Sequence, residues 1–131
     1  MGGTYRDLAV WQKAMGMVTA IYRCTRDFPD DERFGLVSQL RRAAVSVPSN
    51  IAEGKGRASD RDLLHFLVCA RGSINEVQTQ LEIAEALGYA SHDRLRELYA
   101  RAVEIARLLN GLIKALRPTS TSQAQSPKPE A

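Results

Sequence analysis

Basic side chains concentrate in the middle of the chain, between positions 33 and 61. This stretch contains six basic residues and two acidic ones, an excess larger than the net charge of +3 carried by the whole chain. The turn Gly54-Lys55-Gly56-Arg57 contains two glycines, which leave backbone amides accessible to a phosphate oxygen. Few aromatic residues accompany the basic ones, so contacts to a nucleic-acid backbone are favoured over base stacking. The candidate nucleic-acid-binding residues are Arg41, Arg42, Lys55, Arg57 and Arg61.

The same basic residues have an alternative interpretation that involves no ligand. Basic residues near helix ends improve solubility and form salt bridges between subunits, and composition alone gives the two interpretations equal weight. The turn around Lys55 is not the phosphate loop of nucleotidases, because it lacks the longer glycine spacing and the Lys-Ser/Thr pair of that motif. The stretch is therefore a candidate for sequence-independent contact to phosphates.

A second group of polar side chains surrounds Pro48 and consists of Ser46, Asn50 and Glu53. A proline inside a helix removes a backbone hydrogen bond, so we expect a kink or local break here, with the polar cluster as structural compensation. Catalysis is the alternative, but no His or Cys lies near the cluster in the sequence. The Glu-x-x-His pair of di-iron bundles is absent as well. We expect no enzymatic activity, no catalytic or metal-binding residue and no cofactor.

Four segments repeat apolar residues every three or four positions, the period of a helix with one buried face. They run from Leu8 to the Phe28-Pro29 pair, from Val37 to Gly54, from Leu63 to Gly88, and from Leu95 to Leu116. Their connections are short, so we predict an all-α fold, an antiparallel up-down-up-down four-helix bundle over residues 1–117. Residues 118–131 are rich in Pro, Ser and Thr, and we predict a disordered tail there.

The ends of these segments carry capping signals. Ser59 and Ser91 are suited to the N-caps of the third and fourth helices, and Gly88 is suited to a glycine C-cap. The acidic run 30–32 is typical of a first helical turn, so we expect it to begin the second helix.

The first helix carries two apolar stripes, where an isolated bundle needs one. We assign the stripe with Trp11, Met15 and Tyr22 to the bundle's own core. The second stripe lies roughly 120° around the axis, and we expect it to contact another subunit. A wide contact within the same bundle is the alternative. The candidate oligomer-interface residues are Val10, Ala14, Met17, Ile21 and Cys24.

Length and composition indicate one domain without a membrane anchor. The chain has 131 residues, 44% of them hydrophobic and 25% charged. No apolar run reaches the roughly 18 residues that a membrane span needs, and no signal-peptide pattern opens the chain, so we expect a cytoplasmic protein. Cys24 and Cys69 are too few for a disulfide framework, and we expect both to be buried thiols.

Several blocks together resemble one bacterial family. The most specific block runs from Gln39 to Gly54, and Ala70-Arg71-Gly72-Ser73-x-x-Glu76 and Leu87-Gly88-Tyr89 follow it in the expected order. The chain resembles the four-helix-bundle proteins encoded in intervening sequences of 23S ribosomal RNA genes, the S23 family, from about Tyr5 to Leu116. The resemblance implies an antiparallel bundle, assembly into a ring-shaped homopentamer and no enzymatic activity.

A related branch of the family is the accessory variability determinant of diversity-generating retroelements. That protein binds nucleic acid through a basic surface and works with a reverse transcriptase. The resemblance therefore implies RNA or DNA as a partner, and a reverse transcriptase as a partner only where the gene context supports it. We expect a non-catalytic, homo-oligomeric accessory or scaffold protein that contacts nucleic-acid backbone. The alternative is a protein-interaction scaffold that binds no nucleic acid.

Overall fold

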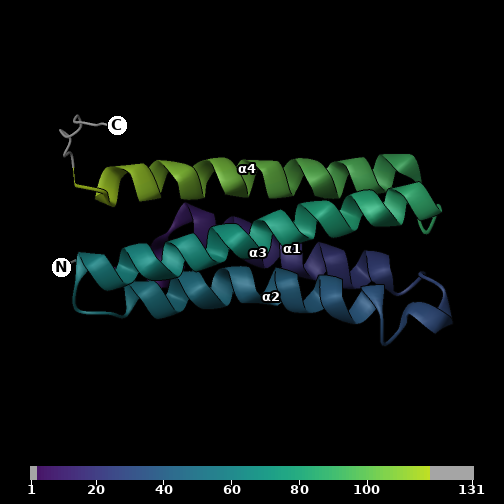
Figure 1. Ribbon diagram of the computed structural model, residues 1–131, viewed down its shortest axis with the longest axis horizontal. Helices are drawn as coiled ribbons and strands as arrows, with labels where there is room; N and C mark the ends of the chain where they lie inside the picture. Colours follow the sequence, from purple (N-terminus) through teal and green to yellow (C-terminus); the bar gives the residue numbers. More distant parts are fainter. Residues whose placement is uncertain (1–2, 119–131) are drawn as a thin grey trace, which may run out of the picture.

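The computed structural model describes residues 3–118 and consists of four long helices with two short 3-10 turns, η1 and η2. Figure 1 shows the helices lying alongside one another and alternating in direction. The element bounds are η1 Tyr5–Asp7, α1 Ala9–Thr25, η2 Asp30–Glu32, α2 Leu36–Lys55, α3 Asp60–Leu87 and α4 His92–Leu116.

The packing of the helices confirms the predicted four-helix bundle. Each helix packs against the next one along the chain, and α1 also packs against α4, which closes the bundle. The interior is formed by aliphatic side chains from all four helices, including Ile21, Leu40, Ile74 and Leu109, each fully buried. Burial of one stripe per helix is the main stabilising contribution expected for such a fold.

The capping residues predicted from the sequence are in place. Ser59 Oγ accepts the backbone N–H of Asp62 at 3.1 Å, and Ser91 Oγ accepts that of Arg94 at 3.2 Å. Gly88 adopts a left-handed conformation with φ 71° at the end of α3. Glycine adopts this conformation without the steric cost that a Cβ adds, so α3 ends there and the chain turns into α4.

The beginning of α2 differs from the sequence prediction. The acidic run forms the separate turn η2, and α2 starts only at Leu36, after the N-cap residue Gly35. Glycine has no side chain with which to cap a helix. Instead, Glu32 Oε1 accepts the backbone N–H of Leu36 at 3.0 Å. The carboxylate thus acts on the first turn of α2 from outside the helix.

Pro48 does not interrupt α2, which is continuous across it, so the local break expected from the sequence does not occur. Asn50 Nδ2 donates to the carbonyl oxygen of Ser46 at 2.8 Å, and Ser49 Oγ donates to that of Val45, also at 2.8 Å. The Ser46 hydroxyl is hydrogen-bonded to the Ser73 hydroxyl on α3. The bonds from Ser49 and Asn50 each span Pro48, which lacks an N–H of its own.

The two stripes of α1 have the opposite roles from those predicted. The stripe assigned to another subunit faces the interior of the chain's own bundle, where α1 packs against α2 and α4. Its residues are at most 3% exposed, which leaves them unavailable to a second copy: Val10, Ala14, Met17, Ile21 and Cys24. Of the stripe assigned to the core, Met15 and Tyr22 are 40% and 39% exposed, and Leu8, Trp11 and Val18 are only partly buried against the core.

Three further expectations concern single residues, the tail and membrane insertion. Cys24 is buried as expected, but Cys69 is exposed on α3, so the prediction of two buried thiols is wrong for Cys69. The predicted tail lies outside the described residues except for Pro118. Within residues 3–118, no helix combines the length and apolar character that crossing a bilayer requires.

Candidate nucleic-acid interface

The five candidate phosphate contacts fall into two groups at different levels of the bundle. Arg41 and Arg42 lie in the second turn of α2, whereas Lys55 is its last residue. Fourteen helical residues separate Arg41 from Lys55, a rise of about 21 Å. A single phosphate cannot contact both groups, so the sequence cluster is not one site in the folded protomer.

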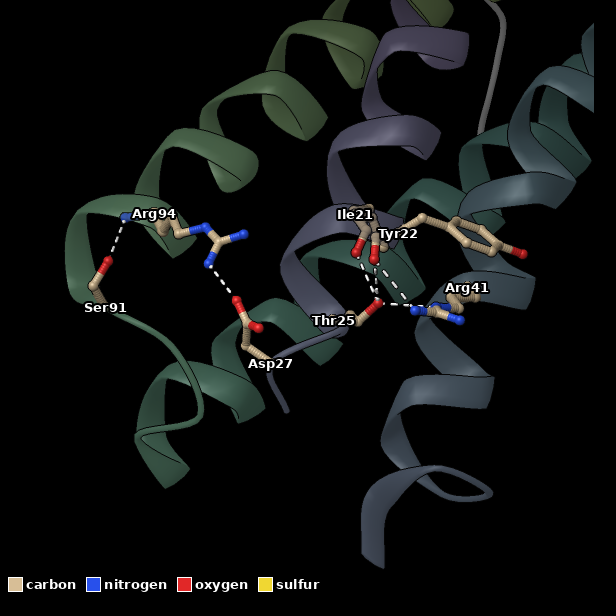
Figure 2. A network of polar contacts seen from close by, with 7 residues as sticks. All are labelled: Ile21, Tyr22, Thr25, Asp27, Arg41, Ser91 and Arg94. Carbon is tan, nitrogen blue, oxygen red and sulfur yellow. Dashed lines mark hydrogen bonds and ion pairs between the residues drawn. The ribbon is translucent and has the colours of Figure 1, made fainter. Parts of the chain in front are cut away.

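Arg41 is held in place by contacts with the end of α1 (Figure 2). Its Nε donates to Thr25 Oγ1 at 2.9 Å, and its Nη2 donates to the carbonyl oxygen of Tyr22 at 3.2 Å. The guanidinium also lies 4.4 Å from the centre of the Tyr22 ring. The Thr25 hydroxyl in turn donates to the carbonyl oxygen of Ile21 at 2.8 Å. Arg41 therefore donates to the Tyr22 carbonyl and to the Thr25 hydroxyl at the negative end of a helix dipole, which is a structural role.

Arg42 is exposed near the beginning of α2, and the other three candidates, Lys55, Arg57 and Arg61, lie where α2 turns into α3, at the left of Figure 1. Arg57 forms an ion pair with Glu53, and its guanidinium lies 5.0 Å from the centre of the Phe66 ring. Lys55 and Arg61 are exposed, and no carboxylate of residues 3–118 lies within ion-pair distance of either. These two cations are thus available to an external anion.

A cleft between α3 and α4 adds further cations at the same end of the bundle. Arg71 Nη1 donates to Asn110 Oδ1 at 3.2 Å, which places these two positions at one level. Arg117 follows seven residues after Asn110, so it lies about one turn from the level of Arg61 on the antiparallel helix. The cleft has a volume of about 340 Å³ and is lined by Arg71, Asn110, Ile113, Lys114, Arg117 and Pro118.

We call this part of the bundle the basic end, meaning residues 5–7, 52–71 and 113–117: η1, the end of α2, its connection to α3, the first part of α3 and the end of α4. Seven basic and four acidic side chains belong to it. The basic ones are Arg6, Lys55, Arg57, Arg61, Arg71, Lys114 and Arg117, and the acidic ones are Asp7, Glu53, Asp60 and Asp62. The opposite end holds the acidic turn η2 and the ion pairs of Arg94 and Arg96.

An apolar groove runs along the outer faces of α1 and α2. It consists of two adjoining hollows of about 350 and 410 Å³, which share Val18 and Val45. Trp11 and Met15 line the first hollow and Tyr22 lines the second. Val45 is itself 40% exposed. Exposed apolar area of this kind marks surfaces that contact other proteins.

The cysteines and histidine within residues 3–118 that could react lie as follows. Burial raises the pKa of the Cys24 thiol, which makes it a poor nucleophile. Cys69 lies 3.8 Å from His65 Nε2, but both are exposed side chains on one helix face. Among residues 3–118, no group of three or more His, Cys, Asp or Glu side chains is placed to hold a metal ion. The chemistry that the described surface offers is anion binding and apolar contact.

Of the predicted polar cluster, Ser46 and Asn50 lie together at the α2–α3 contact, and Glu53 points instead to Arg57.

Arg71, Lys114 and Arg117 were not predicted as site residues. Lys114 and Arg117 are far in sequence from the basic stretch 33–61, and only the antiparallel pairing of α3 with α4 brings them beside Arg71 at the same end. A count of charge along the chain cannot detect that proximity.

The fold and surface define an all-α protein, an antiparallel four-helix bundle with one predominantly basic end. The model of the 23S rRNA-intervening sequence protein family matches residues 6–111. The chain therefore belongs to this family, which confirms the resemblance found in the sequence.

Comparison with solved structures supports the four-helix fold. A crystal structure of a protein of unknown function from the S23 ribosomal protein family of Bacteroides thetaiotaomicron superposes with a TM-score of 0.74. The two chains are 24% identical, and the match covers 81% of this chain and 99% of the other, so the likeness concerns the fold. No curated protein sequence matches the chain at a significant level.

Proposed function

We propose that this protein is a non-enzymatic nucleic-acid-binding accessory or scaffold protein that works as a homo-oligomer in the cytoplasm. The observation that carries the proposal is the basic end, where Lys55 and Arg61 have no carboxylate partner among the described residues. Unpaired surface cations attract the phosphates of RNA or DNA, and they do so without reading sequence. The bundle needs no cofactor for this role.

The proposal includes a homo-oligomer because the basic end of a single protomer would bind nucleic acid only weakly. We assign the subunit contact to the apolar groove of α1 and α2, which includes Trp11, Met15 and Tyr22. The resemblance to the S23 family implies a homopentamer. In such a ring, each basic end that binds raises the effective concentration of the next one for the same nucleic acid.

A titration of labelled structured RNA and duplex DNA tests the proposal. We expect binding at about 50 mM salt that weakens steeply by about 200 mM, with little dependence on sequence. The variant Lys55→Gln/Arg61→Gln should bind at least tenfold more weakly. Its matched control is Arg33→Gln/Arg96→Gln, which removes the same charge at the opposite end and should bind nearly as well as the unmodified protein. Absence of binding at about 50 mM salt would exclude the proposal.

The apolar groove also favours a second candidate, a protein-interaction scaffold without nucleic-acid binding. An oligomer that forms normally but binds neither RNA nor DNA at low salt would support this candidate. The genes beside the coding sequence decide whether a reverse transcriptase is a partner. An adjacent reverse transcriptase with template repeats would favour the retroelement role, and insertion within a ribosomal RNA gene would favour the other lineage.

A further inference from the structure

The cleft between α3 and α4 differs from the first half of α4 in the pairing of its charges. Along the first part of α4, arginines are paired: Arg94 with Asp27 at 3.2 Å, and Arg101 with Glu97 at 2.8 Å. Lys114 and Arg117, at the other end, have no carboxylate of residues 3–118 within ion-pair distance. Positive charge is therefore neutralised on one part of the helix and left uncompensated on the other.

Arg71 on α3 is the third basic residue that lines the cleft. It is half-buried, and its Nη1 donates to the neutral amide oxygen of Asn110. A neutral partner holds the guanidinium in position without cancelling its charge, and an arginine has further N–H donors to offer. The side chain is thus positioned in advance for an anion, which reduces the entropy lost on binding.

The helix dipole at the C-terminal end of α4 does not by itself explain why three cations lie in the cleft. A helix C-terminus carries about half a negative charge, so a single basic residue is enough to balance it. Arg71, Lys114 and Arg117 exceed that requirement, and no acidic side chain lines the cleft. Arg71 is the partly buried member of this group, whereas Lys114 and Arg117 are exposed, so reduced solvent screening strengthens the attraction for an anion mainly at Arg71.

We infer that the α3–α4 cleft is a phosphate-binding site in which Arg71 and Lys114 contact the phosphate oxygens and Asn110 orients Arg71. Planar guanidinium donors match tetrahedral phosphate oxygens, and the volume of about 340 Å³ lies at the small end of ligand sites. The phosphate belongs either to a nucleic-acid backbone or to a small free phosphate. The first source rests on the proposed function, whereas phosphate binding itself does not.

Two probes applied to the full chain test the inference. Inorganic pyrophosphate and a labelled structured RNA are each titrated at about 50 mM salt, with the NMR signal of the Arg71 Nε–H as the readout of the cleft. The variants are Arg71→Gln and Lys114→Gln, and Arg96→Gln is the control because it lies on α4 and is already paired with Glu85. Circular dichroism establishes that each variant retains the helical fold.

We expect both probes to shift the Arg71 signal. Each cleft variant should lose about tenfold in RNA affinity and reduce the salt dependence by about one phosphate contact, while Arg96→Gln changes affinity less than twofold. A shift of the Arg71 signal with pyrophosphate but not with RNA would support the cleft as a site for small free phosphates and overturn nucleic acid as its ligand, and the proposed function would then rest on Lys55 and Arg61 alone. RNA binding that the cleft variants leave unchanged, with no shift of Arg71 by either probe, would overturn the inference and leave the proposed function standing.

Discussion

The phenol of Tyr89 donates a hydrogen bond to Glu32 Oε2 at 2.5 Å and joins the α3–α4 connection to the turn before α2. The other oxygen of the same carboxylate caps α2 through the backbone N–H of Leu36. The bond from Tyr89 is the larger cause, and the cap the smaller, of a lowered pKa for Glu32. The same bond raises the pKa of Tyr89. One side chain thus couples two connections at the end opposite the basic end.

We expect Glu32→Gln to destabilise the bundle near neutral pH and to have little effect in acid. The pKa of Glu32 is lower in the folded chain than its ordinary value of 4.5, so ionisation favours folding above that value. This contribution disappears as the pH falls through the folded pKa. Thermal unfolding of both proteins between about pH 7 and pH 3 measures the difference. A difference in melting temperature that stays constant with pH would contradict the prediction. Tyr89→Phe, which keeps the α2 cap, should cause a smaller loss.

We expect Arg41→Gln to reduce stability rather than nucleic-acid affinity. The substitution removes the bonds to Thr25 Oγ1 and to the Tyr22 carbonyl oxygen, at an expected cost of about 1–2 kcal/mol in the free energy of unfolding. Arg41→Lys keeps the charge but not this geometry, so it should be destabilising too. Urea unfolding and the RNA titration measure the two effects separately. If the variants were as stable as the unmodified protein but bound RNA more weakly, the prediction would be wrong and Arg41 would be a phosphate contact.

Gly54→Ala should be destabilising because α2 and α3 approach closely at that position. An added Cβ would lie 2.8 Å from Phe66 Cβ and 3.2 Å from Leu63 Cδ1, so the two helices must separate. We expect a loss of about 1–3 kcal/mol. Gly72→Ala is the control, since a Cβ there meets no atom within 4 Å, and it should stabilise α3 by about 0.5–1 kcal/mol. Chemical unfolding compares them, and equal effects would refute the close contact.

Substitutions at two methionines on α1 distinguish the core from the proposed subunit contact. Met17 is 0% exposed, and Met17→Ala should reduce stability by about 2–5 kcal/mol. Met15 is 40% exposed and lines the apolar groove, so Met15→Lys should preserve helix content but lower the mass of the assembly. Circular dichroism and light scattering distinguish the outcomes. An assembly whose mass is unaffected by Met15→Lys would exclude the groove as the subunit contact.

The sequence alone determined the features that depend on neighbouring residues. Helical periodicity, the N-caps at Ser59 and Ser91 and the C-cap at Gly88 are local properties, and all appear in the structure. Short connections then leave an antiparallel bundle as the favoured arrangement. The family could be recognised too, because its motifs are linear.

The tertiary structure decided which stripe of α1 is buried. Both stripes have helical spacing, so periodicity cannot rank them. The bundle buries Ala14 and Met17 completely, leaves Trp11 partly buried and leaves Tyr22 exposed. Small and aliphatic side chains allow close helix packing without polar atoms, whereas the indole N–H and the phenol OH can remain hydrated at the surface.

The tertiary structure also decided which partners the charged side chains have. Arg41 became a contact to the end of α1 because Thr25 and the Tyr22 carbonyl lie opposite it, a pairing across 16 and 19 residues. Arg71 and Lys114 came to share a cleft through the pairing of α3 with α4. The sequence determines where charges occur along the chain. Their partners and their availability depend on distances between helices, which only the folded arrangement sets.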